Sequence, residues 1–307
     1  MKPINHIKIS KDMKVNDLVK AMHESGVMQA GKIGKAVNIL EKMIGDKDCK
    51  VFFGVAGAMV PGGMRQIIID MLKEKWVDVF VTTGATLTHD IAEALGHRHY
   101  QGHHNADDRE LDKLGIDRMY DSYMKDDVYK SIEDFIMGLR NKFSKRKFGI
   151  QEFLWELGKN LENESILRVC YENKIPIFCP ALADSGLGNI IWINLIQENY
   201  IEVGAFDDLK EIMNLAWDCK KAGVIYVGGG VPKNYIQQAM QFCGKSNGAD
   251  FGIQITTDRI EYGGSSGASL KEGISWGKMQ YEADYVDVSC DATIALPLII
   301  SALKDRI

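Results

Sequence analysis

Apolar residues along the chain follow two alternating patterns. Short, nearly continuous apolar runs are typical of buried strands, whereas apolar side chains that recur every three or four residues indicate core-facing helices. The predicted strands are 50–54, 77–83, 175–179, 224–227, 249–257 and 285–289. The predicted helices include a short one around Val15 to Met22 and the segments 32–44, 64–75, 128–143 and 209–220. This alternation predicts a Rossmann-like, doubly wound α/β fold, with a mostly parallel sheet of six or more strands and helices on both faces.

The same alternation continues through all 307 residues, without a repeat, a low-complexity tract or a Pro/Ser-rich linker. A chain of this length buries about three quarters of its unfolded surface. We therefore expect one domain over residues 1–307, preceded by a short arm of about residues 1–12.

Charge and apolar segments exclude several classes of function. The net charge is −5 and the longest basic run is the triplet at 145–147, which argues against a nucleic-acid partner. The longest nearly apolar run, 292–303, has about 12 residues against the roughly 20 that span a bilayer. The first ten residues lack the apolar core of a secretory signal. We expect a cytoplasmic protein without a membrane segment.

Cysteine and histidine patterns do not indicate a metal or disulfide framework. The six cysteines are scattered without a CxxC pair, so we expect free thiols. His97, His99, His103 and His104 form the only dense histidine group. Because this group has no cysteine nearby and lies in a polar loop pattern, we expect no metal site there.

Three predicted strands end in glycine-bearing turns, at 54–63, 82–85 and 228–230. One interpretation is structural, because such turns require glycine wherever φ is positive. The other is functional, since turns at the carboxyl ends of parallel strands form the crevice where α/β folds bind nucleotide cofactors. None matches GxGxxG, but together they favour a nucleotide-type cofactor. The candidate residues in these turns are Gly57, Ala58, Thr83, Gly84, Ala85, Gly228 and Gly230.

The segment 263–278 carries the most unusual pattern of the chain. Ser269 followed by Glu272 predicts a capped short helix, in which Glu272 and Trp276 share a face, and Gly277 is expected to end it. Lys278 then follows the turn. It is either an ordinary surface lysine or a lysine in an apolar pocket, where burial lowers the amine pKa and allows imine formation.

These motifs, in this order and spacing, resemble the deoxyhypusine synthase family from about residue 12 to the end of the chain. The matching residues are Glu272, the run 275–278, Asp291-Ala292, the run 295–298, the Gly-Gly-Gly-Val-x-Lys turn at 228–233 and the Pro-Ala-Leu-Ala-Asp stretch at 180–188. The resemblance implies NAD as cofactor, spermidine as aminobutyl donor, an acceptor lysine on translation initiation factor 5A, and a homotetramer.

The resemblance also implies roles for individual residues. Lys278 is the expected covalent nucleophile, and Glu272 and Trp276 are expected to hold the polyamine. Further cofactor positions are Asp184, Thr257, Gly263, Asp291 and Ala292, in addition to the glycine turns. Further substrate positions are Asn189, Asn234, Ser265 and Ser266.

Several of these positions depart from the family pattern. Asn189 and Ser265 replace acidic residues, and Asn234 replaces a histidine that accepts a proton in the relatives. Thr88 and His89 stand where the family turn has two acids. Because an amide cannot take up a proton near neutral pH, the proton must pass to His89, Glu272 or water.

Three functions are consistent with this sequence. The first is deoxyhypusine synthesis. The second is formation of homospermidine or another polyamine on a small amine acceptor, which the neutral substitutions favour. The third is a regulatory protein that binds NAD without catalysis. Lys278 beside Glu272 and Trp276 argues against the third, because cofactor binding alone needs no imine-forming amine.

Overall fold

The computed structural model describes residues 1–143, 146–197, 200–243 and 248–307. By its packing the chain forms two compact units. Unit 1 comprises residues 1–57, 76–81 and 211–307, and unit 2 comprises residues 58–75 and 82–210. The single domain over 1–307 stays a prediction. The expected N-terminal arm is exposed and has neither helix nor strand in residues 1–12.

Unit 1 is built on a parallel sheet with strands in the order β11-β10-β9-β1-β2. These strands are β1 (Cys49–Val55), β2 (Val79–Val81), β9 (Lys221–Val227), β10 (Ala249–Ile255) and β11 (Met279–Val288). Phe52 at the centre of β1 pairs with Val79 on one side and Val224 on the other, and all three side chains are buried. Both faces of these parallel strands are covered by other elements, so neither face contacts water. This explains why their sequences are nearly continuous apolar runs.

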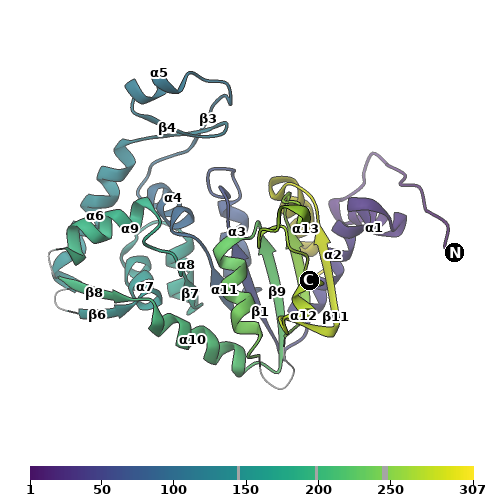
Figure 1. Ribbon diagram of the computed structural model, residues 1–307. Helices are drawn as coiled ribbons and strands as arrows, with labels where there is room; N and C mark the ends of the chain where they lie inside the picture. The colour runs from purple at the N-terminus through teal and green to yellow at the C-terminus, as the bar shows by residue number, and fades with distance from the viewer. Residues whose placement is uncertain (144–145, 198–199, 244–247) are drawn as a thin grey trace. The chain divides into compact units, whose positions relative to one another are not determined.

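Helices cover both faces of this sheet (Figure 1). α2 packs against β1, β10 and β11, and α11 packs against β1, β2 and β9. α1 and α13 lie against α2 and each other. The helices of unit 1 are α1 (Val15–Ser25), α2 (Met28–Gly45), α11 (Gly230–Met240), the 3-10 helix η2 (Ile260–Tyr262), α12 (Glu272–Ser275) and α13 (Ala292–Lys304). This confirms the predicted α/β class.

Unit 2 is mainly helical, with small sheets. Its core includes three rings, Phe143, Phe148 and Phe153, whose centroids are 5.4 to 5.7 Å apart. Its helices are α3 (Arg65–Lys73), α4 (Gly84–Ala94), α5 (Asp108–Lys113), α6 (Asp127–Phe143), α7 (Ile150–Asn160), α8 (Ile166–Asn173), α9 (Gly186–Ile191) and the π-helix η1 (Trp192–Ile196). α10 (Phe206–Trp217) begins in unit 2 and ends in unit 1.

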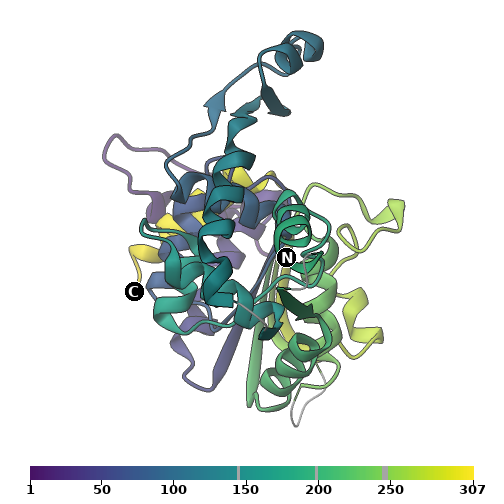
Figure 2. The ribbon, with the colours of Figure 1, turned by 90° about the vertical axis from the view of Figure 1, so that its left-hand side faces the viewer.

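The remaining strands of unit 2 are short. They are β3 (Tyr100–Gln101), β4 (Ile116–Met119), β5 (Ser122–Lys125), β6 (Arg146–Gly149), β7 (Ile177–Phe178) and β8 (Ile201–Gly204). β3, β5 and β4 form an antiparallel sheet that, with α5, extends away from the other helices of unit 2 (Figure 2). β6 and β8 pair in parallel.

Each of the six predicted apolar runs contains a strand, and each predicted helix is present. The pattern missed β3, β4, β5, β6 and β8, because these short strands are partly or fully exposed and carry no continuous apolar run. No helix among the described residues is long and apolar enough to cross a membrane.

Candidate active site

Several predicted cofactor residues meet at the carboxyl edge of the unit 1 sheet. Backbone hydrogen bonds join successive strand ends: Ala56 N donates to Val227 O (2.9 Å), Gly228 N to Ile255 O (2.9 Å), and Thr256 N to Val288 O (3.1 Å). Gly57 and Thr257 lie two residues after the ends of β1 and β10, and Asp291 lies three residues after the end of β11. Parallel strands place their carboxyl ends on one edge, so residues far apart in the chain are gathered there.

The glycines of this edge give it an open backbone surface. Gly57, Gly228, Gly230 and Gly263 have φ values of 86°, 70°, 56° and 70°, which side chains with a Cβ adopt rarely. A Cβ on Gly228 would lie 3.0 Å from Ala56 O, whereas Gly230 and Gly263 have no atom within 4 Å of that position. Backbone amides with free space beside them suit a dinucleotide that is bound by close approach of the main chain. These residues therefore fit NAD.

Asp291 and Ala292 also have a structural role in this edge. Asp291 is the N-cap of α13, where its Oδ1 accepts hydrogen bonds from Thr293 N (2.7 Å) and Thr293 Oγ1 (2.8 Å). Ala292 is the buried first residue of that helix. The cap fixes the start of α13 against the strand ends.

Lys233 is a functional candidate that the sequence interpretation did not single out. Its side chain is 1% exposed, and its Nζ donates hydrogen bonds of 2.6 Å to both Ser265 O and Ala268 O. Burial lowers the pKa of this ammonium to about 8, although the charges of Asp287 and Glu272 act in the opposite direction. The sequence did carry a sign of this burial. Lys233 ends the Gly-Gly-Gly-Val-x-Lys motif and falls on the apolar, core-facing side of the helix that follows the glycines.

The segment 265–278 lies along α11 from its first turn to its end. Lys233 holds Ser265 and Ala268 at the first turn, and Gln241, just after the last turn, donates to Trp276 O (2.7 Å). A Cβ on Gly229 would lie 2.2 Å from Ser266 Cα, so the glycine turn and this segment are in direct backbone contact. Ser265 and Ser266 are thereby held next to the Gly228–Gly230 turn.

Local hydrogen bonds place the Lys278 amine beside Trp276, as the sequence suggested. Ser269 Oγ accepts from Glu272 N (3.3 Å), the first residue of α12, but the N-cap of this helix is Lys271 rather than the predicted Ser269. At the other end Gly277 has a left-handed φ of 67°, and Lys278 N donates to Gly273 O (2.8 Å), a Schellman-type end. The chain reversal leaves Lys278 Nζ 5.2 Å from the centroid of the Trp276 ring.

Lys278 is half-buried, and burial lowers the pKa of its amine below that of a free lysine. The carboxylate of Glu272 opposes this shift because it favours the charged ammonium. Glu272 and Trp276 are both exposed, Trp276 at 60%. The amine is thus partly desolvated, with an indole face and a carboxylate available for a cationic ligand.

Lys278 does not lie at the carboxyl edge of the sheet. Its carbonyl accepts from Ala249 N, the first residue of β10, which puts its backbone at the amino edge. The two edges are separated by the seven residues of β10, about 20 Å of strand. Unit 1 therefore holds the predicted site residues in two groups, joined by the segment 265–278.

Unit 2 brings together the second glycine turn and the stretch 184–189. Thr83 is the N-cap of α4, and its Oγ1 accepts from Thr86 N (3.3 Å). A Cβ on Gly84 would lie 2.3 Å from Ser185 Oγ, so only glycine allows this approach. Thr88 Oγ1 accepts from Leu187 N (3.1 Å). Asp184 and Asn189, at the two ends of this stretch, are exposed, as are Ala58 and Ala85.

A largely apolar cavity of about 320 Å³ adjoins Asn189. It is lined by the loop Pro180 to Ala183, by Gly188 and Asn189, and by apolar side chains that include Trp192 and Ile196 of η1. Asn189 provides a neutral polar side chain at an otherwise apolar wall. An aliphatic chain fits this lining better than a second ammonium group would.

The histidine group does not converge on a metal. His97 Nε2 lies 2.8 Å from Ser131 Oγ, whereas the rings of His103 and His104 stack on each other at 4.9 Å. His99 contacts Glu93 and His89 instead. Within the described ranges no three His, Cys, Asp or Glu side chains are arranged to hold a metal ion. All six cysteines are free.

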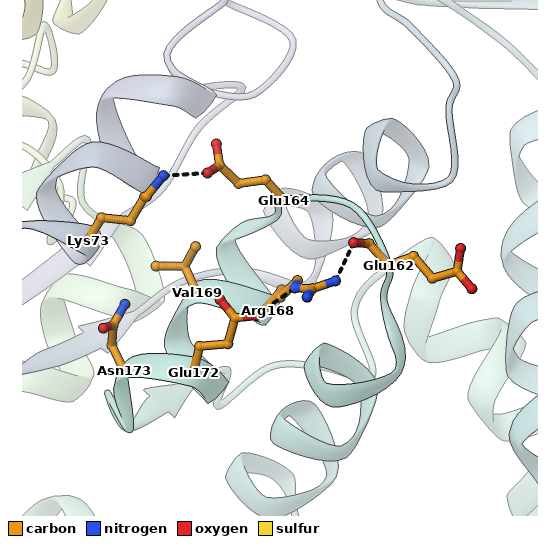
Figure 3. Close-up of a pocket in the computed structure, with 7 residues that line it drawn as sticks. All are labelled: Lys73, Glu162, Glu164, Arg168, Val169, Glu172 and Asn173. Atoms are coloured by element: carbon orange, nitrogen blue, oxygen red, sulfur yellow. Dashed lines mark hydrogen bonds and ion pairs between the residues drawn. The ribbon is translucent and has the colours of Figure 1, made fainter.

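A second cavity of unit 2, about 460 Å³, is bordered by ion pairs (Figure 3). Lys73 Nζ lies 2.6 Å from Glu164 Oε1, and Arg168 Nε lies 2.7 Å from Glu172 Oε1. Arg168 also donates to the backbone oxygens of Leu161 and Glu162. Each of the two cations is thus already paired with a carboxylate, and none of the predicted site residues lines this cavity.

Comparison with known proteins decides the family. The deoxyhypusine synthase family model matches residues 17–303. A protein of Methanosarcina acetivorans named probable deoxyhypusine synthase 1 is 42% identical over 306 residues, which are 99% of this chain and 95% of that protein. A protein of Archaeoglobus fulgidus with the same name is 40% identical over 299 residues, 97% of this chain and 96% of that protein.

This chain belongs to the deoxyhypusine synthase family. A crystal structure named for deoxyhypusine synthase from Entamoeba histolytica supports the fold, with a TM-score of 0.64 and 23% identity over 97% of this chain and 96% of that one. Membership in the deoxyhypusine synthase family indicates a transferase.

The three positions at which the chain is expected to depart from the family pattern are accessible in the structure. Asn189, Asn234 and Ser265 are all exposed side chains, so their substitution leaves no buried charge unpaired. Asn234 lies in the first turn of α11 next to buried Lys233. These are thus surface positions that a ligand can contact.

Proposed function

We propose that this protein transfers the aminobutyl group of spermidine to an acceptor amine, with NAD as cofactor and with a covalent imine on Lys278. The preferred acceptor is a lysine of translation initiation factor 5A, which gives deoxyhypusine. The observation that carries the proposal is the half-buried Lys278 amine, 5.2 Å from the Trp276 ring centroid and within the field of Glu272.

The residues that would hold NAD are those of the open glycine edge and of the second glycine turn. In unit 1 they are Gly57, Gly228, Gly230, Thr257, Gly263, Asp291 and Ala292. In unit 2 they are Ala58, Thr83, Gly84, Ala85 and Asp184. When bound, NAD supplies a hydride acceptor for the amine carbon of spermidine and a hydride donor at the end of the reaction.

Lys278 performs the transfer itself. Its neutral amine attacks the imine carbon of oxidised spermidine, a new Nζ–C bond forms, and the old C–N bond breaks with release of the diaminopropane part. The acceptor amine then attacks the same carbon and releases Lys278. Desolvation favours the first attack because it raises the neutral fraction of the amine.

Glu272 and Trp276 would orient the polyamine during this transfer. A carboxylate attracts an ammonium end of the substrate, and an indole face attracts a cation within about 6 Å. Both side chains are exposed on the short helix α12 and at its end, so they are available to a ligand.

The test is covalent trapping. The protein is incubated with NAD and spermidine, reduced with borohydride and digested, and the peptides are mapped by mass spectrometry. We expect an aminobutyl adduct on Lys278. An adduct on another lysine, or transfer without any lysine adduct, would contradict the mechanism.

Homospermidine or another small polyamine is the second candidate product. It is favoured by the neutral, exposed Asn189, Asn234 and Ser265 and by the apolar cavity beside Asn189. A competition with spermidine, putrescine and purified initiation factor 5A together distinguishes the two, since modified factor without a small product supports the preferred acceptor.

We also propose a cytoplasmic homotetramer with the sites at subunit interfaces, on the family resemblance alone. Because the two edges of one unit 1 sheet are about 20 Å apart, the Lys278 of one copy would act with the cofactor residues of another. Light scattering at micromolar concentration tests the assembly, and a monomeric mass would contradict it.

A further inference from the structure

One face of α11 in unit 1 carries three long polar side chains in a row. Lys233, Gln237 and Gln241 are spaced four residues apart, so they lie one above the other along the helix. Lys233 and Gln237 are only 1% and 7% exposed, although lysine and glutamine are mostly exposed in proteins. Lys233 holds the first half of the segment 265–278 through two hydrogen bonds. The row therefore faces the segment that carries the candidate nucleophile.

Gln237 and Gln241 face the second half of this segment. A Cβ on the buried Gly273 would lie 3.9 Å from Gln237 Nε2 and 3.5 Å from Lys278 Cβ. The amide of Gln237 and the stem of Lys278 thus both adjoin the backbone of α12 at one glycine. One helical turn further on, Gln241 Nε2 donates to Trp276 O at 2.7 Å.

The carbonyl that Gln241 binds lies at the end of α12. Trp276 is the C-cap of this helix, and the last carbonyls of a helix have no partner within it. Because a carbonyl oxygen can only accept, the Gln241 amide must present its nitrogen, which fixes the orientation of the amide. A side chain of α11 therefore satisfies the end of a helix that lies 35 residues further along the chain.

The turn at Gly277 and the hydrogen bond from Gln241 determine different aspects of the geometry. The turn places the Lys278 amine relative to Trp276, with Nζ 5.2 Å from the ring centroid. It does not determine how closely the turn lies against the rest of unit 1. Lys278 O accepts from Ala249 N of β10, and Gln241 holds the peptide group between Trp276 and Gly277. The turn is thus held at two points, by β10 and by the end of α11.

The position of this turn against α11 determines how much water reaches the Lys278 amine. Burial is the main cause that lowers the pKa of this amine, and the carboxylate of Glu272 on α12 opposes it. Lys233 on α11 is the nearby cation, and Asp287 on β11 acts on Lys233 with the opposite sign. A turn that moved away from α11 would expose the amine, and its pKa would rise towards that of a free lysine.

We propose that Gln241 is a positioning residue for the nucleophile, because its hydrogen bond to Trp276 O holds the turn from Trp276 to Lys278 against α11 and keeps the amine partly shielded from water. The assignment rests on the proposed function, in which Lys278 forms the imine. Gln241 contacts neither substrate nor cofactor in this role. It acts on the amine through the main chain at Gly277.

The first test measures the pKa of the Lys278 amine in the complete protein without any ligand. The lysines are methylated reductively with carbon-13 formaldehyde, and the signal that is absent in Lys278→Arg is titrated by NMR. Gln241→Met keeps the length of the side chain but cannot donate, so we expect a higher pKa than in the unaltered protein. Gln238→Met, at an exposed glutamine of α11, is the matched control and should leave the pKa unchanged. An unchanged pKa in Gln241→Met would overturn the proposal.

The second test measures the single-turnover rate of imine formation on Lys278 with NAD and spermidine across pH. A displacement of about 1 Å at a reacting group can cost about 100-fold in rate, so we expect the rate of Gln241→Met to fall about 10- to 100-fold. The pH of its half-maximal rate should rise, since a more exposed amine loses its proton at higher pH. Gln238→Met should match the unaltered protein in both respects.

A rescue variant separates the hydrogen bond from the bulk of the side chain. Gln241→Lys keeps a donor of similar reach for Trp276 O. At the plateau of each pH profile, where the Lys278 amine is neutral, this variant should retain most of the rate that Gln241→Met loses. Equal losses in the two variants would show that the donor is not what positions the amine, and would overturn the assignment.

The outcomes also separate this proposal from the proposed function. Absence of any imine in the unaltered protein would overturn both. Imine formation that Gln241→Met leaves within about threefold of the unaltered rate, with the same pH profile, would overturn the positioning role and leave the function standing. A loss in Gln241→Met that is equal in Gln238→Met would indicate a general effect on α11 and also overturn the assignment.

Discussion

Lys278 in unit 1 and His89 in unit 2 are two basic side chains whose pKa values burial lowers, but their surroundings differ. Lys278 is placed by bonds within a ten-residue segment, and the opposing field comes from Glu272 in the same segment. His89 is placed by a partner ten residues away that is itself held by Glu93. The backbone turn within the segment places Lys278, whereas His89 is oriented by side-chain contacts with the loop that follows its own helix.

Removal of the Lys278 amine tests whether this side chain is the nucleophile. Of the substitutions considered, it should reduce aminobutyl transfer the most. Lys278→Arg should abolish imine formation and aminobutyl transfer, because guanidinium stays protonated and cannot form the imine. Borohydride trapping with peptide mapping measures the loss. Lys271→Arg, an exposed lysine of the same segment, is the control and should keep full activity. Transfer by Lys278→Arg would exclude this lysine as the nucleophile.

Substitution of Lys233 tests whether the placement of the segment 265–278 depends on the two hydrogen bonds that this side chain donates to it. In Lys233→Met, Ser265 O loses its donor, whereas Ala268 O keeps Gln254 Nε2 at 3.0 Å. We expect the free energy of unfolding to fall by about 1–3 kcal/mol at pH 7, measured by denaturant titration. Lys220→Met, which removes an exposed ion pair with Asp48, should change the free energy of unfolding much less, because water screens this pair.

The same variant predicts a pH dependence. The folded-state pKa of Lys233, about 8, lies below the ordinary lysine value of 10.5, so the unfolded chain binds more protons between these two values. The stability of the unaltered protein relative to Lys233→Met should therefore increase as pH rises from about 8 towards 10. A difference that is constant over this range would show that the ammonium is well solvated.

Asn189 tests whether unit 2 contributes to polyamine recognition. Asn189→Asp restores a carboxylate at an exposed position beside the 320 Å³ cavity. A charge-assisted hydrogen bond to an ammonium should strengthen spermidine binding by about tenfold, measured by calorimetry with NAD present. Asn214→Asp, at an exposed position of α10, adds the same charge elsewhere and should leave affinity unchanged. Equal gains in both would indicate a nonspecific charge effect.

Trp276 should give the smallest effect. Its ring is 60% exposed, so loss of the cation–π contact in Trp276→Leu should weaken spermidine binding by about two- to fivefold, corresponding to 0.5–1 kcal/mol. Trp217→Leu, at a tryptophan that is 65% exposed on α10, is the matched control. A loss of more than about fiftyfold would mean that the indole is enclosed when the substrate is bound.

The sequence alone predicted the parts of this protein that short-range interactions determine. Apolar runs indicated β1, β9 and β10, because a strand that is buried on both faces needs a continuous apolar side-chain set. The end of α12 and the place of Lys278 beside Trp276 followed from Ser269, Glu272 and Gly277, whose hydrogen bonds span at most five residues. The spacing of residue types encodes such contacts directly.

Tertiary structure decided the contacts that span longer stretches of chain. Lys233 reaches carbonyls 32 and 35 residues away, and Thr88 accepts from an amide 99 residues away. The spacing of His89, Glu93 and His99 did not indicate their hydrogen bonds, although these span only six and ten residues. Burial, partner and proton position depend on which elements pack together, and the free energy of that packing comes from apolar surface distributed over each whole unit.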